Sequence, residues 1–142
     1  MDNTELDVHA KNTITELQPL FVQIKAISND LMVNSNIQDI NRYCSHQDTL
    51  TGIYGNLNIK YKQIRALKKN KEVEYYCNLK LETNVNNTKF VSASAEKEAS
   101  YYVAPLREAR DIIEGYIEII ITSIATCRNH IWEYKQDRKN DV

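Results

Sequence analysis

The sequence has little glycine or proline: three glycines and two prolines in 142 residues. A fold with many strands needs frequent turns, and these two residues supply most of them. Their scarcity therefore favours long helices. The length suits one domain, and 42% hydrophobic residues are enough for a core. We expect a small, mainly α domain over residues 1–142, with residues 1–12 and 136–142 frayed at its ends.

Cysteine is also scarce, and Cys44, Cys77 and Cys127 have no paired spacing. Their odd number and wide separation predict free thiols, which are typical of an intracellular, cytoplasmic protein. The first residues lack the basic and apolar regions of a signal peptide. The most apolar stretch, 112–124, is interrupted by two glutamates and is too short to span a bilayer. We therefore expect no membrane association.

The sequence lacks the common motifs of catalytic and cofactor sites. It has no glycine-rich phosphate loop, no dinucleotide-binding glycine motif and no serine nucleophile elbow. His9, His46 and His130 have no partner at a metal-ligand spacing. Glu114 and Glu118 lie one helical turn apart, as carboxylates on helix surfaces often do. We expect no enzymatic activity, no metal and no cofactor.

Apolar residues recur every three or four positions in the first part of the chain, which predicts helices. The first is expected from Thr13 to about Leu31, with Thr13 and Glu16 as a capping box. Pro19 lies inside this pattern and should kink the helix or start a new one. After a break, a short helix capped by Ser35 is expected.

A long helix should follow, starting near Ser45, but residues 72–91 fit two structures. Apolar and polar residues alternate over 73–81, a turn is plausible at 84–87, and 89–91 could return as a second strand. This pattern predicts a short β-hairpin. In the alternative, the long helix continues to about residue 81.

Residues 92–138 are predicted to be helical, with Pro105 either dividing the region or forming the first turn of a long C-terminal helix. Its apolar surface is wider than one stripe, because Ile112, Ile119 and Ile121 lie off the main face. Such a surface implies burial on more than one side. We expect these three isoleucines to form the interface of a homo-oligomer.

Positive charge is concentrated in one segment, although the formal charge of the whole chain is −1. Residues 60–71 contain six basic residues and no acidic one, and two tyrosines follow. Lysines neutralise phosphates and rings stack on bases, so this combination favours binding of single-stranded nucleic acid. The alternative is a solvated helix face. The predicted DNA-binding residues are Lys60, Lys62, Arg65, Lys68, Lys69, Lys71, Tyr75 and Tyr76.

If this segment is helical, we expect its lysines to lie on a face that its apolar residues do not share. One of Tyr75 and Tyr76 should be exposed and the other should belong to the core, because neighbouring side chains point apart. The lysine face would hold Lys60, Lys68 and Lys71, with Arg65 and Lys69 beside it, and Leu57, Ile64 and Leu67 would face elsewhere.

Two segments resemble the UvsY family of bacteriophage recombination mediators. One is Ser94-Ala95-Glu96-Lys97-Glu98, followed by Leu106 and a long apolar helix with Arg128 near its end. The other is the basic helix that leads into Glu74-Tyr75-Tyr76. The resemblance covers residues 50–138 at most. It has one departure: Glu72 interrupts the position where the family has basic residues, and the lysines lie slightly upstream.

The resemblance implies a small oligomeric protein that binds single-stranded DNA in the cytoplasm of a phage-infected cell. It also implies contacts with a recombinase and with a single-strand-binding protein, and a role in helping one of these two proteins to replace the other. It implies no catalytic site. A different class of function stays open. A phage helical interaction protein, either a virion component or an inhibitor of a host defence system, would also use wide apolar helices and a lysine face.

Overall fold

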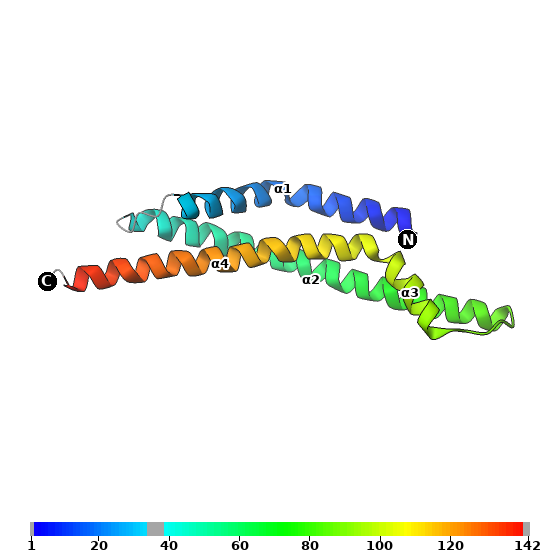
Figure 1. Ribbon diagram of the computed structural model, residues 1–142. Helices are drawn as coiled ribbons and strands as arrows, with labels where there is room; N and C mark the ends of the chain where they lie inside the picture. The colour runs from blue at the N-terminus through cyan, green and yellow to red at the C-terminus, as the bar shows by residue number, and fades with distance from the viewer. Residues whose placement is uncertain (1, 34–38, 141–142) are drawn as a thin grey trace. The chain divides into compact units, whose positions relative to one another are not determined.

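The computed structural model describes residues 2–33 and 39–140, and nearly all of them are helical (Figure 1). The elements are α1 (Asn3–Val33), α2 (Ile40–Val85), α3 (Ser92–Tyr102) and α4 (Ala104–Asn140). The described part contains no strand. The prediction of a mainly α fold with a long C-terminal helix is confirmed.

The β-hairpin predicted for residues 72–91 is wrong, because α2 continues to Val85. Burial follows the helical period rather than alternation: Tyr75, Tyr76 and Leu79 are half-buried, whereas Val73 is exposed. The alternative reading, a continued helix, is the one that the structure bears out.

The end of α2 is closed by a Schellman motif, which explains the turn signal in the sequence. The Thr88 N–H donates to the Thr83 carbonyl at 3.0 Å. Asn87 lies between them with φ 53°, a left-handed conformation that asparagine tolerates better than most residues. The asparagines of this segment therefore end a helix rather than join two strands.

The helix α1 begins at Asn3 rather than Thr13, and Asp2 and Glu5 form its capping box. The Glu5 N–H donates to Asp2 Oδ1 at 2.8 Å, and the Asp2 N–H donates to Glu5 Oε2 at 2.9 Å. Thr13 lies inside the helix, where its hydroxyl donates to the His9 carbonyl at 3.0 Å. Thr13 and Glu16 have the three-residue spacing of a capping box, but the helix is capped further upstream, by Asp2 and Glu5.

The proline positions have different outcomes. Pro19 lies inside α1, which is assigned as one continuous helix, so it does not start a new one. Pro105 lies in the first turn of α4, as one of the two expectations had it. The helix α2 begins at Ile40 rather than near Ser45, and the cap expected at Ser35 lies outside the described residues.

Buried residues of α2 and α4 recur at intervals of seven. This spacing is typical of helices that pack along their length with knobs in holes. The series in α2 is Tyr43, Leu50, Leu57 and Ile64, and the series in α4 is Leu106, Ile113, Ile120 and Cys127.

The described residues form two compact units, each built from parts of the long helices. Unit 1 contains residues 2–16 and 60–112, and unit 2 contains residues 17–33, 39–59 and 113–140. In unit 1, Leu6 and Ala10 of α1 are buried, so the segment expected to be frayed contributes to its core.

Ring contacts join the three helices of unit 2. Phe21 of α1 stacks on Tyr116 of α4, with ring centroids 3.9 Å apart and planes at 8°. Tyr43 of α2 stacks on His130 of α4 at 4.5 Å. Helix α1 also meets α2 through Asp30, whose carboxylate lies 2.7 Å from His46 Nε2. Stacked rings add about 0.5–1.5 kcal/mol beyond the area they bury.

Candidate nucleic-acid interface

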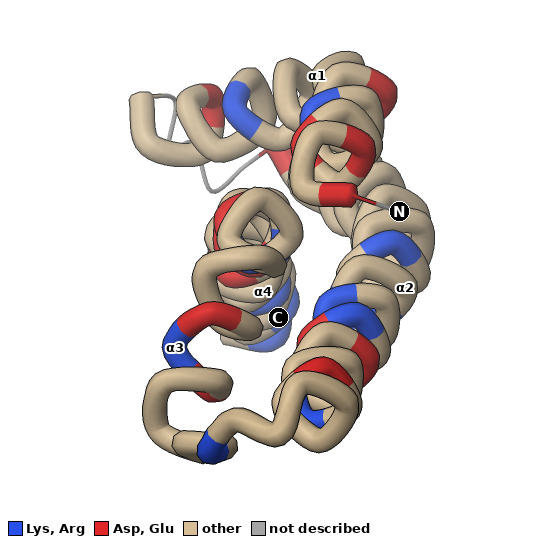
Figure 2. Tube along the Cα trace, turned by 90° about the vertical axis from the view of Figure 1, so that its right-hand side faces the viewer, with Lys and Arg blue, Asp and Glu red and all other residues tan. Residues whose placement is uncertain are grey.

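Three of the predicted DNA-binding residues form an exposed basic stripe on α2. Lys62, Arg65 and Lys69 follow one another at intervals of three and four residues, which places them on one side of the helix. All three are exposed and form no ion pair within the described part of the chain. Figure 2 marks the basic positions of α2 in blue. We call these three residues the basic stripe.

The expectation that Lys60, Lys68 and Lys71 lie on a face apart from the apolar residues of the helix is wrong. These lysines are half-buried and lie on the side of α2 that carries Leu57 and Ile64. Lys71 follows Ile64 by seven residues, as Ile64 follows Leu57, and two helical turns bring such positions to the same side.

Two of these inner lysines are balanced by carboxylates of the same helix. Lys68 Nζ lies 3.0 Å from Glu72 Oε2, and Lys71 Nζ lies 3.2 Å from Glu74 Oε2. Glu72 is the residue by which the sequence departs from the UvsY pattern. The three cations of the basic stripe form no such pair within the described part of the chain.

Lys60 lines a polar cavity of about 290 Å³ between the parts of α1 and α2 that belong to unit 1. His9 and Glu16 of α1 and Gln63 of α2 also line it. Lys60 therefore shares this cavity with a carboxylate and other polar side chains of the fold.

Tyr75 and Tyr76 both make ring contacts inside unit 1. Tyr75 stacks on Tyr102 of α3, with centroids 4.5 Å apart and planes at 19°, and Tyr76 meets the edge of Phe90 at 5.5 Å. Both are half-buried, so the structure differs from the expected division into one exposed and one core ring. Burial raises the pKa of Tyr102, against a smaller opposing effect of Lys71.

The three isoleucines expected to form one subunit interface lie in different surroundings. Ile112 belongs to unit 1, whereas Ile119 and Ile121 belong to unit 2. Ile119 lines a small cavity beside Ser28, and Ile121 is 54% exposed. The spread follows from the helical period, because residues 119 and 121 differ by about 200° around the axis.

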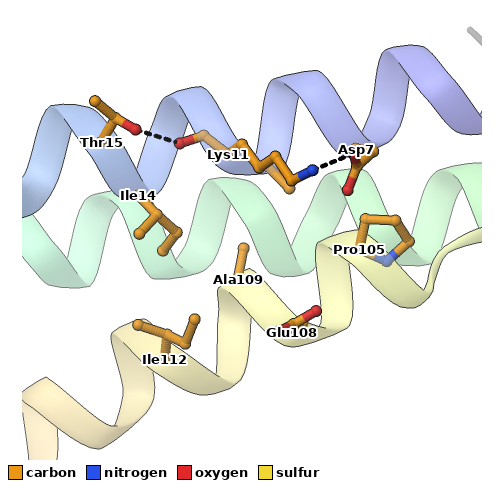
Figure 3. A pocket seen from close by; sticks show the side chains of 9 residues that line it. Asp7, Lys11, Ile14, Thr15, Pro105, Glu108, Ala109 and Ile112 are labelled. Atoms are coloured by element: carbon orange, nitrogen blue, oxygen red, sulfur yellow. Dashed lines mark hydrogen bonds and ion pairs between the residues drawn. The ribbon is translucent and has the colours of Figure 1, made fainter.

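Ile112 lines a groove of about 370 Å³ between α1 and α4 in unit 1 (Figure 3). Ile14 and Ala109 form its apolar floor, and Asp7 and Lys11 form an ion pair at its rim, with Nζ and Oδ2 2.8 Å apart. The hydrogen bond from Lys11 to Asp7 raises the pKa of the lysine. The charges of Asp7 and Lys11 are thus paired, while Glu108 also lines the groove.

Two exposed aromatic residues were not predicted as site residues. Tyr101 is 82% exposed on α3, and Trp132 is 61% exposed on α4. A signal for Trp132 exists in the sequence, since it follows Ile121 at a helical interval on the side away from the buried series of α4. No signal in the sequence distinguishes Tyr101 from the half-buried Tyr102 beside it.

The structure confirms that the three cysteines are free: Cys44 and Cys77 are exposed, and Cys127 is buried. Burial raises the pKa of the Cys127 thiol. Within residues 2–33 and 39–140, no three histidine, cysteine or acidic side chains gather as metal ligands would.

The same described residues contain no helix with the length and apolarity needed to cross a membrane. Comparisons of the chain with protein families, with curated proteins and with solved structures found no match.

Proposed function

We propose that this chain binds single-stranded DNA through the basic stripe and acts as an accessory protein of phage recombination. In this role it is a homo-oligomer, has no catalytic activity and helps a recombinase to replace a single-strand-binding protein. The observation that carries the DNA-binding part is the stripe of Lys62, Arg65 and Lys69, which is exposed and forms no ion pair within the described part of the chain.

The chemistry of the stripe suits a phosphate backbone. Its three cations lie along about two turns of α2, so they can meet successive phosphates of a flexible strand and release counterions. Three charges give only a weak site in one subunit. An oligomer repeats the stripe, and a strand that spans several copies is held by effective concentration.

The test compares two triple-alanine variants that remove the same charge from the same helical segment. One replaces the stripe (Lys62→Ala, Arg65→Ala, Lys69→Ala), and its matched control replaces the inner lysines. The control variant is Lys60→Ala, Lys68→Ala and Lys71→Ala.

Oligonucleotide affinity is measured at several salt concentrations. We expect the stripe variant to lose about 2 units of the log–log salt slope, from about 0.7 per phosphate on single strands. The control should keep most of its slope. Circular dichroism is used to check that both variants are folded. Equal slopes in all three proteins, or no binding by the wild type at low salt, would refute the proposal.

The engagement of Tyr75 and Tyr76 inside unit 1 favours a second candidate function. With these two rings engaged in the fold, the helices suit protein contacts, as in a phage virion component or an inhibitor of a host defence system. Tight binding to a host protein with no affinity for oligonucleotides would favour this function.

A further inference from the structure

The outward side of α4 in unit 2 carries a second heptad stripe that the fold does not bury. Its members are separated alternately by four and three residues, as in the seam of a coiled coil. All of them are exposed. We call them the outer stripe: Glu114, Glu118, Ile121, Ala125, Arg128, Trp132, Lys135 and Lys139.

The outer stripe is distinct from the core seam of α4. The core seam includes Ile113, Ile120 and Cys127, which are fully buried. In contrast, Ile121 is 54% exposed and Trp132 is 61% exposed. An exposed tryptophan and isoleucine in a helical seam are typical of a surface that is covered by a partner.

Charge changes sign along the outer stripe. The two acidic residues precede the apolar centre and the two lysines follow it. None of these four residues forms an ion pair within the described part of the chain. Glu118 and Lys135 are about 25 Å apart along the helix, so they cannot pair within one copy.

A second copy in antiparallel orientation gives every residue of the outer stripe a complementary neighbour. With Ile121 of one copy against Trp132 of the other, Ala125 meets Arg128. Glu118 then meets Lys135, and Glu114 meets Lys139 by the same register. The two-fold axis repeats every contact, so the surface complements itself. A parallel pair would instead place glutamate against glutamate and lysine against lysine.

We infer that two copies of this chain associate through the outer stripe as an antiparallel helix pair. The paired segment, residues 114–139, is about 38 Å long. Ile121 of each copy packs against Trp132 of the other, which gives two symmetry-related apolar contacts. Between them, the aliphatic part of Arg128 covers Ala125. Of the three isoleucines predicted to form the interface, only Ile121 takes part.

The inference names the self-association surface of the proposed homo-oligomer, so in that respect it rests on the proposed function. Its test uses no nucleic acid. A failure here leaves DNA binding by the basic stripe untouched, and a failure of DNA binding leaves the helix pair untouched.

The test is a charge swap followed by mass measurement in solution. Glu118→Lys or Lys135→Glu alone places like charges opposite each other at both symmetry-related contacts. We expect each single variant to dissociate about tenfold more readily than the wild type. The double variant restores opposite charges and should restore the wild-type dissociation constant. Glu82→Lys and Lys97→Glu, exposed positions outside the stripe, are the matched controls.

Trp132 supplies an independent signal, because it is the only tryptophan of the chain. Its emission should shift to shorter wavelength as protein concentration rises, and the shift should follow the mass. Trp132→Ala should abolish the dimer while circular dichroism remains unchanged.

Three results would overturn the inference. One is a wild type that stays monomeric at high concentration. Another is a pair of single variants that dimerise as well as the wild type, as a parallel pair or another surface would allow. The third is a folded double variant that stays as weak as the single variants.

Discussion

Among single residues, Tyr75 shows how a side chain suited to stacking on a base is used inside the fold. One face of its ring is occupied by Tyr102, at a centroid distance of 4.5 Å. A ring stacked in this way holds α2 against α3 within unit 1.

Tyr75→Ala should therefore lower the free energy of unfolding by about 1–3 kcal/mol, because it removes a stacked pair and leaves a gap. Urea unfolding followed by circular dichroism measures the change. Tyr101→Ala is the control, since that ring is 82% exposed and should cost little. Equal stabilities for the two variants would show that the Tyr75 contact does not contribute.

The exposure of single lysines could be predicted only from their spacing relative to the buried residues of the helix. The exposure of Lys62, Arg65 and Lys69 follows from spacing alone. Lys60, Lys68 and Lys71 were expected on the outside because lysines are mostly exposed, yet their spacing from Ile64 puts them beside the core. Burial of a long aliphatic stem overrides the preference of the charged end, which can still reach Glu72 or Glu74.

At the scale of elements, α1 contains Pro19 within a helix assigned from Asn3 to Val33. Proline lacks the N–H that would donate to the carbonyl four residues earlier, and its ring crowds that carbonyl. Packing of Leu17 and Phe21 in unit 2 keeps the helix in place on both sides of it.

Pro19→Ala should stabilise the protein by up to about 3 kcal/mol, because the helix regains a hydrogen bond and Pro19 is exposed. Thermal unfolding checks this prediction. Gln18→Ala, a neighbouring exposed position, should change the melting temperature little. A lower melting temperature for Pro19→Ala would mean that the local distortion is required by the packing of α1.

Element types were easier to predict than their ends. The helical period of apolar residues indicated most of the helices, and Pro105 marked where the long C-terminal helix begins. The start of α1 was missed because Asp2–Glu5 and Thr13–Glu16 have the same capping-box spacing, and the sequence does not tell which one closes a helix. The alternation at 73–81 favoured a strand only because Val73 and Leu81, which are exposed, were counted as core.

At the scale of the whole molecule, the three thiols differ in access. Cys44 and Cys77 are exposed, whereas Cys127 is buried in unit 2 and has a raised pKa. The thiolate is the reactive form, so burial and a raised pKa both protect Cys127.

A thiol reagent should therefore label two cysteines per native chain quickly and the third only after denaturation, without prior reduction. Mass spectrometry counts the labels. The Cys44→Ser, Cys77→Ser variant should show almost no native labelling. Fast labelling of Cys127 in that variant would contradict the burial of this residue.

The seven-residue spacing of α2 also restricts how this chain can change in length. One residue added between Ile64 and Tyr75 would turn everything beyond it by about 100° around the helix axis. Tyr75 would then leave Tyr102, and any inner lysine beyond the insertion would turn away from the side of α2 that carries Ile64. Insertions of seven residues between Lys69 and Tyr75 preserve both the core and the basic stripe. Homologues of different length should therefore differ in this part of α2 by whole heptads.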